Sequence, residues 1–243
     1  MIDIHCHILP GIDDGASSVK ESVLMCEAAQ LSSVDTVVAT PHFDAGIEDI
    51  ARWKEDAAQR LSSLKEALRE TYIPMDIYPG GEVLFTPELI DPMRRGEVPC
   101  LAESDYMLVE FYFDESLFEI DDMLSRLASI GVHPVIAHPE RYFAVQENPD
   151  TIIGWFRKGY VIQVNKGSIM GRLGRGAQSA SRWILNHGLA HIAASDAHKA
   201  NVRTPELSSL RELLEAEYSE DYADILLTQN PRRIILNKPM VDA

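Results

Sequence analysis

The stretch MIDIHCHILPGIDDG, residues 1–15, alternates apolar and polar side chains before it enters a loop flanked by glycines. Apolar positions alternate with Asp3, His5 and His7, and this period of two predicts a strand. Because alternate residues of a strand point to the same side, His5 and His7 are expected to direct two imidazoles at one point. The pair alone does not establish a metal site, since two half-buried histidines satisfied by hydrogen bonds give the same pattern.

The composition is that of an ordinary globular protein, and it narrows the choice of partners. The chain has 243 residues, 46% of them hydrophobic, which is enough for one well-buried core. Its net charge of −16 disfavours nucleic acid, because an acidic surface repels phosphate backbones. No signal sequence and no apolar run of about 18 residues is visible, so no membrane insertion is expected. The three cysteines (Cys6, Cys26, Cys100) have no metal-type spacing and cannot all pair, which favours a reducing cytoplasm.

Strand and helix patterns alternate along the whole chain. The expected strands cover residues 2–7, 35–40, 75–78, 106–111, 134–138, 160–165 and 190–194. The expected helices cover residues 18–32, 50–70, 121–130, 152–158, 177–187, 205–217 and 221–227, with a short helix and loop in 86–100, a glycine-rich loop over 167–176 and a tail after Pro231. This alternation without a linker predicts one α/β domain over residues 1–243, built on parallel strands as a barrel or as an open sheet. The helices from about 205 to 243 are expected to pack on that core.

Side chains that bind metals well occur at the ends of six of the seven predicted strands, and Asn165 ends the other. They are His5 and His7, His42, Glu82, Glu110, His138, and Asp196 with His198. In a parallel barrel the strand C-termini meet on one face, so these eight side chains would share one cleft, which favours the barrel. For His42 and Glu82 a loop or turn role is the alternative. An unpaired Glu110 in an apolar strand would be costly, which favours a binding role.

Eight ligands exceed the needs of one ion and predict two or three divalent ions. Imidazole and carboxylate without thiolate suit Mn, Fe or Zn. Cys6 should point away from this set and into the core. Three other histidines do not share the strand-end pattern and are expected to be structural: His133, His187 and His191.

Clustered metal ions are typical of phosphoester hydrolysis, in which they activate water and neutralise phosphate charge. Arg141 and Arg203 follow candidate ligands closely and can clamp a phosphate dianion, with a surface ion pair as the alternative role. Asp13 or Asp14 can donate a proton to the leaving oxygen, or can simply cap the loop. No cysteine is followed six positions later by an arginine, which excludes a cysteine-dependent phosphatase.

Seven motifs together resemble the polymerase and histidinol phosphatase (PHP) superfamily: DIHCHILPGIDDG, ATPH, GGEV, LVEF, AHPERY, QVNKGSIMGR and SDAH. Within it, they resemble the bacterial manganese-dependent protein-tyrosine phosphatases of capsule and exopolysaccharide operons (the CpsB/CapC/YwqE type) over about residues 1–205. The resemblance implies a distorted (β/α)7 TIM-like barrel, a three-metal site that favours manganese, and hydrolysis of phosphotyrosine. The implied substrate is a tyrosine autokinase with a tyrosine-rich tail that controls polysaccharide chain length or export.

By position, the eight strand-end side chains match the metal ligands of that family, and Arg141 and Arg203 match its phosphate-binding arginines. The expected catalytic residues are therefore Arg141, Arg203 and Asp14, with direct attack by a metal-bound hydroxide and no phosphoenzyme. Two alternatives stay open: a small-molecule phosphatase of the histidinol-phosphatase type, and a non-catalytic metal-binding module.

Overall fold

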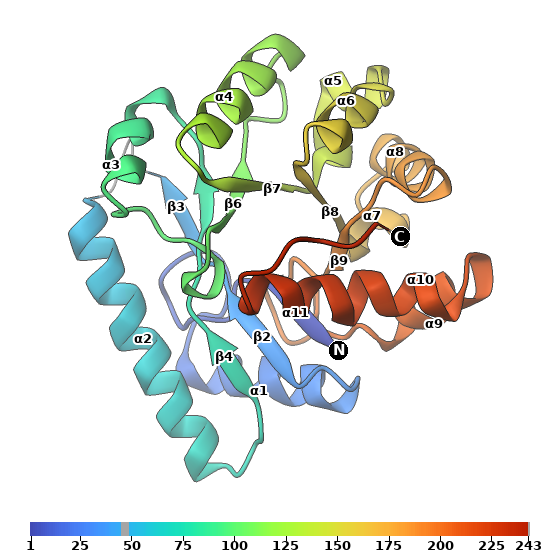
Figure 1. Cartoon of the computed structure of the whole chain (residues 1–243). Helices are drawn as coiled ribbons and strands as arrows, with labels where there is room; N and C mark the ends of the chain where they lie inside the picture. Colours follow the sequence, from blue (N-terminus) through green and yellow to red (C-terminus); the bar gives the residue numbers. More distant parts are fainter. Residues whose placement is uncertain (45–48, 243) are drawn as a thin grey trace.

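The computed structural model describes residues 1–44 and 49–242, and Figure 1 shows strands at the centre with helices around them. The strands pair in parallel as two sheets, in the orders β1-β2-β4 and β3-β5-β6-β7-β8-β9. Their bounds are β1 Ile2–Cys6, β2 Thr36–Ala39, β3 His42–Asp44, β4 Asp76–Tyr78, β5 Glu82–Leu84, β6 Tyr106–Glu110, β7 His133–Ala137, β8 Val161–Asn165 and β9 Ile192–Ala194. The predicted α/β class with parallel strands is confirmed.

Two of the predicted strands continue, after a bend, as second short strands that the sequence did not reveal. β2 leads through Pro41 into β3, and β4 leads through Pro79 and two glycines into β5. The bend after β4 requires Gly80, because a Cβ there would lie 2.9 Å from a side-chain carbon of Val38. The short strands pair with each other in a register that sets His42 opposite Glu82. Both residues therefore begin strands, whereas the sequence placed them after strand ends.

Backbone hydrogen bonds between β1 and the segment after β9 join the two sheets. The backbone N–H of His7 donates to the carbonyl of Ala197 at 2.8 Å, and that of Asp196 donates to the carbonyl of His5 at 2.9 Å. Cys6 and Ala197 form an isolated parallel bridge. The strands thus follow one another around a common core, in agreement with the predicted distorted barrel. The ladder is interrupted at this bridge and at the two bends.

The helices lie outside the strands, as Figure 1 shows. They are α1 Val19–Leu31, α2 Ile50–Glu70, α3 Ile90–Arg94, α4 Leu117–Ser129, α5 Phe143–Glu147, α6 Thr151–Arg157, α7 Lys166–Ile169, α8 Arg175–Asn186, α9 Ser208–Glu217, α10 Glu220–Asp224 and α11 Asn230–Ile235. The short helix α7 occupies the start of the predicted glycine-rich loop. Pro231 lies in the first turn of α11 rather than before a tail, because its missing N–H is no loss in a first helical turn. No helix within the described ranges combines the length and apolarity needed to cross a bilayer.

Among the C-terminal helices, α11 contacts β1. Asn230 fixes this packing by donating to the carbonyl of His191 at 2.9 Å. His191 is itself buried and accepts a hydrogen bond from the backbone N–H of Ile162. Burial lowers its pKa to about 4, which keeps the ring neutral. His191 therefore makes structural contacts, and Cys6 lies in the apolar core.

Candidate metal centre

The eight predicted ligand side chains come together in one cluster, with Asp14 beside them. Each of four groups brings three or four ligand atoms within 4.8 Å of one another. The groups are His7, Asp14, His42 and His198; His5, His7 and Asp196; His5, Glu82 and His138; and His42, Glu82 and Glu110. Because His5, His7, His42 and Glu82 each belong to two groups, the cluster is continuous rather than a set of separate sites.

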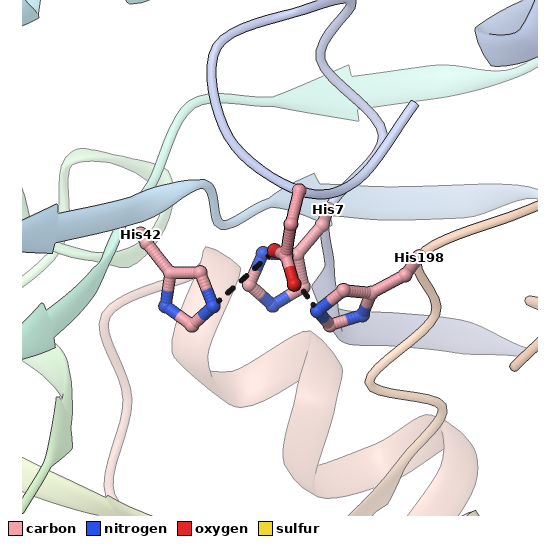
Figure 2. A group of neighbouring side chains, drawn as sticks. His7, His42 and His198 are labelled. Carbon is pink, nitrogen blue, oxygen red and sulfur yellow. Dashed lines mark ion pairs between the residues drawn. The ribbon is translucent and has the colours of Figure 1, made fainter. Parts of the chain in front are cut away.

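The period of β1 explains the two central imidazoles. His5 and His7 are both fully buried, and their Nε2 atoms lie 3.3 Å apart. Figure 2 shows His7 between His42 and His198, and its dashed lines mark the ion pairs that join the outer two rings to one carboxylate. That carboxylate is Asp14, whose Oδ1 lies 3.6 Å from His42 Nε2 and 3.4 Å from His198 Nε2.

Glu82 occupies the centre of the cluster. Its side chain is 1% exposed, and its carboxylate contacts four imidazoles. The distances are 2.9 Å to His138 Nε2, 3.1 Å to His42 Nδ1, 3.2 Å to His5 Nε2 and 3.3 Å to His7 Nε2. Burial opposes ionisation, but the charge of His5 and the hydrogen bonds from the histidines hold the pKa of Glu82 well below its usual range. An ionised carboxylate among nitrogen donors is a suitable bridging ligand for clustered divalent ions.

Asp196 links the cluster to both predicted arginines. Its Oδ1 lies 3.5 Å from a ring nitrogen of each of three histidines: His5, His7 and His198. Its Oδ2 faces the other way, 2.5 Å from Arg203 and 3.4 Å from Arg141. Asp196 has a left-handed backbone (φ 49°), which turns the chain sharply after β9. One carboxylate thus faces the candidate ligands with one oxygen and the arginines with the other.

The electrostatics of the cluster fit bound cations. Although burial disfavours the charged form of His5, Glu82 and Asp196 raise its pKa to about 9. Hydrogen bonds that the His7 ring donates to Asp13 and Asp196 raise the pKa of His7 in the same way, against burial. The acids around His5 and His7 therefore draw protons onto these two imidazoles, which would be neutral in water. Divalent ions would take the place of these protons, because metal-bound histidines must be neutral.

Asp13 and Asp14, in the first loop, contact different parts of the cluster. The sequence did not distinguish their roles. Asp13 lies behind His7 and accepts from its Nδ1 at 2.8 Å, so the Nε2 of His7 faces the cluster. Asp13 also accepts from the backbone N–H of Gly15, where a Cβ would overlap the carbonyl of His7. Asp14 is 68% exposed at the mouth of the cluster. Its expected role as a proton donor stays a prediction.

Two amides on β8 join three of the candidate ligands, and the sequence assigned no role to Gln163. Gln163 Oε1 accepts from His5 Nδ1 at 3.0 Å and from the backbone N–H of His138 at 3.3 Å. Gln163 Nε2 donates to Asn165 Oδ1 at 2.9 Å, and Asn165 Nδ2 donates to Asp196 Oδ2 at 2.6 Å. The amides are two residues apart on one strand, so they share a face, and this spacing in an apolar strand is the signal that could have indicated both.

Buried Asp3 was also missed, although it shares the strand face of His5 and His7. It accepts from the hydroxyl of Ser195 at 2.5 Å and from the backbone N–H of Ser195 at 3.1 Å. These bonds fix the residue before Asp196. Asp3 therefore supports the turn that carries the Asp196 carboxylate into the cluster.

We expect Gln163→Leu to weaken metal binding by about 10- to 100-fold, the usual effect of removing a hydrogen-bond partner from a metal-ligating histidine. Leucine fills a similar volume but leaves His5 Nδ1 and the backbone N–H of His138 without an acceptor. Titration of the metal-free variant against a competing chelator measures the loss. Gln178→Leu on the outer helix α8 is the matched control. Equal metal affinity in Gln163→Leu and the unmodified protein would contradict the role of Gln163.

Comparison with known proteins shows close relatives over nearly the whole chain. A family model described as "Capsular polysaccharide synthesis, CpsB/CapC" matches residues 1–236. The tyrosine-protein phosphatase YwqE of Bacillus subtilis is 33% identical over 240 residues, covering 98% of this chain and 92% of that protein. The tyrosine-protein phosphatase CpsB of Streptococcus pneumoniae is 30% identical over 243 residues, covering 98% and 99%.

Solved structures agree with this likeness. The chain matches a structure described under "YwqE from Bacillus subtilis and CpsB from Streptococcus pneumoniae, unique metal-dependent tyrosine phosphatases", with a TM-score of 0.90 and 32% identity, covering 100% of this chain and 97% of the other. A TatD-like protein from Archaeoglobus fulgidus matches with a TM-score of 0.54 at 14% identity, covering 97% and 100%, and shows a likeness of fold alone.

Proposed function

Because this chain belongs to the CpsB/CapC family of capsular polysaccharide synthesis, we propose that it is a metal-dependent protein-tyrosine phosphatase. One observation of the site supports this most strongly. Asp196 lies between a cluster of histidines and acids on one side and two arginines on the other. A phosphate monoester needs both of these neighbours, cations for its reacting oxygens and fixed donors for its charge.

The candidate ligands would hold two or three ions, with manganese favoured and iron or zinc as alternatives. Such ions supply a nucleophile from water at neutral pH and neutralise the phosphate oxygens. We assign the ligand role to the eight residues predicted from strand ends: His5, His7, His42, Glu82, Glu110, His138, Asp196 and His198. Glu82 would be the central ligand, since its carboxylate contacts four imidazoles and belongs to two groups of the cluster.

The side chains around the cluster bind and orient the substrate. Arg141 and Arg203 form ion pairs with Asp196 Oδ2 at 3.4 and 2.5 Å, which holds both guanidiniums toward the place of the phosphate. A phosphate dianion offers them more acceptor oxygens than one carboxylate oxygen does. Asp14 is the exposed acid at the mouth, and we propose that it protonates the leaving oxygen.

The substrate that fits this family is a phosphorylated tyrosine autokinase that acts in polysaccharide synthesis. The names of the relatives support the tyrosine specificity, and the family description supports the pathway. The net charge of −16 leaves the arginine pair as a local positive feature on an acidic protein, suited to a phosphorylated side chain rather than to a polyanion.

The decisive experiment compares substrates on protein that has been stripped by a chelator and reloaded with Mn²⁺. We expect no turnover by the stripped protein and restored turnover of a phosphotyrosine peptide, with a far lower kcat/KM for histidinol phosphate. A preference for histidinol phosphate would overturn the protein-phosphatase proposal. Tight metal binding with no turnover of either substrate would indicate a non-catalytic module instead.

A further inference from the structure

An aromatic side chain lies beside one of the two candidate phosphate-binding arginines. Phe113 follows β6, and the guanidinium carbon of Arg141 lies 4.4 Å from the centre of its ring. The centres of the Phe113 and His138 rings are 6.0 Å apart. Phe113 is only half-buried. One aromatic ring thus adjoins a candidate metal ligand and a candidate phosphate donor, and part of it is open to solvent.

Phe143 begins α5, and its backbone is hydrogen-bonded to that of Phe113. The backbone N–H of Phe143 donates to the carbonyl of Phe113 at 2.9 Å, and the residue is 56% exposed. Within residues 1–44 and 49–242, the phenylalanines with exposed rings are Phe118 and Phe143, in the segments after β6 and β7. Those segments directly follow Glu110 and His138. Exposed apolar residues are common one at a time, but these border the face on which β/α barrels build their sites.

We propose that Phe113 and Phe143 form an aryl-binding wall for the ring of an aryl phosphate whose phosphate group lies between Arg141 and the metal cluster. This inference rests on the proposed phosphatase function and deepens it, since it names the part of the site that selects aryl over alkyl monoesters. In an aryl phosphate one oxygen joins the phosphorus to the ring, so the ring must lie close to the phosphate. Aromatic pairs are favourable at centre distances of about 4.5–7 Å, so an aryl ring beside Phe113 would gain such a contact.

A supporting role for Phe113 makes a different prediction. If its ring only held Arg141 through the cation–π contact, its loss would weaken every phosphate ligand alike. If Phe113 and Phe143 bind the aryl ring, their loss weakens only ligands that carry a ring. Ligands with and without a ring therefore separate the two roles.

The test is calorimetric binding of benzylphosphonate and of inorganic phosphate to the Mn²⁺-loaded protein. The variants are Phe143→Ala and Phe113→Leu. The matched control is Tyr72→Asn, which removes a 91% exposed aromatic ring after the C-terminal end of α2, where the left-handed backbone (φ 56°) tolerates asparagine. We expect the Kd for benzylphosphonate to rise about three- to tenfold in both variants, the scale of one lost aromatic pair. The Kd for inorganic phosphate, and both Kd values of Tyr72→Asn, should stay unchanged.

If the variants bind both ligands more weakly by the same factor, or bind benzylphosphonate with an unchanged Kd, Phe113 and Phe143 do not bind the aryl ring. The same conclusion follows if the unmodified protein binds benzylphosphonate no more tightly than inorganic phosphate. Binding is measured without turnover, so its result does not depend on whether the protein is a phosphatase. A protein that binds benzylphosphonate through this wall but does not hydrolyse phosphotyrosine peptides would contradict the phosphatase proposal alone.

Discussion

Glu82→Gln is expected to remove bound metal and to lower kcat/KM by about 10²- to 10⁴-fold. The substitution keeps the shape of the side chain but replaces an ionised carboxylate with a neutral amide among four imidazoles. Breaking a buried ionic contact by removing one partner costs about 3–5 kcal/mol, and each 1.4 kcal/mol corresponds to a factor of ten. Because Glu82 belongs to two groups of the cluster, more than one ion should lose affinity.

Metal analysis after gel filtration, together with a kinetic assay on a phosphotyrosine peptide, measures both effects. Glu110→Gln provides a graded comparison, since its carboxylate is more exposed and lies 3.5 Å from His138 and 3.8 Å from His42. We expect Glu110→Gln to lose less metal and less kcat/KM than Glu82→Gln. Glu97→Gln, whose partner is the exposed Arg95, is the control for loss of a surface charge. Full metal content and full activity in Glu82→Gln would refute the central place of this carboxylate.

The sequence predicted which side chains converge because parallel strands have a simple geometry. The period of two in β1 placed His5 and His7 on one side, and their Nε2 atoms are 3.3 Å apart. The rule that parallel strands end on one face brought in residues far along the chain, such as His138 and Asp196. Neither rule depends on the details of packing, so both apply without a structure.

The sequence could not predict how the cluster is built around Glu82. β3 and β5 have three residues each, which is too short for a periodic signal, yet their register sets His42 opposite Glu82. The roles of Gln163 and Asp3 depend on hydrogen bonds between strands that are distant in sequence. The start of the predicted glycine-rich loop forms α7, where Lys166 is anchored by the carbonyls of Thr204 and Glu206. Such tertiary contacts override local composition.

Arg203→Ala and Arg141→Ala are each expected to lower kcat/KM for a phosphotyrosine peptide by about 10²-fold while metal content stays unchanged. Each change removes a charged donor aimed at a charged group in a partly buried site, where such a donor contributes about 2.7–4 kcal/mol. Metal should remain, because the arginines contact Asp196 through Oδ2, whereas Oδ1 faces the histidines. Loss of metal in either variant would show that the two sides of Asp196 do not act separately.

The two arginines should also depend on each other. Both contact the same oxygen of Asp196 and would contact the same phosphate, and residues that share partners seldom have additive effects. Arg203 is the closer of the two, and the carbonyl of Arg203 accepts from the backbone N–H of His198, which ties its loop to the cluster. We therefore expect a double-mutant cycle on kcat/KM to show a coupling of about 1 kcal/mol. Arg141→Lys and Arg203→Lys should recover little, because an ammonium cannot reproduce the planar fork of a guanidinium. Full activity in Arg141→Ala, or strict additivity in the double variant, would mean that the two guanidiniums do not bind one phosphate.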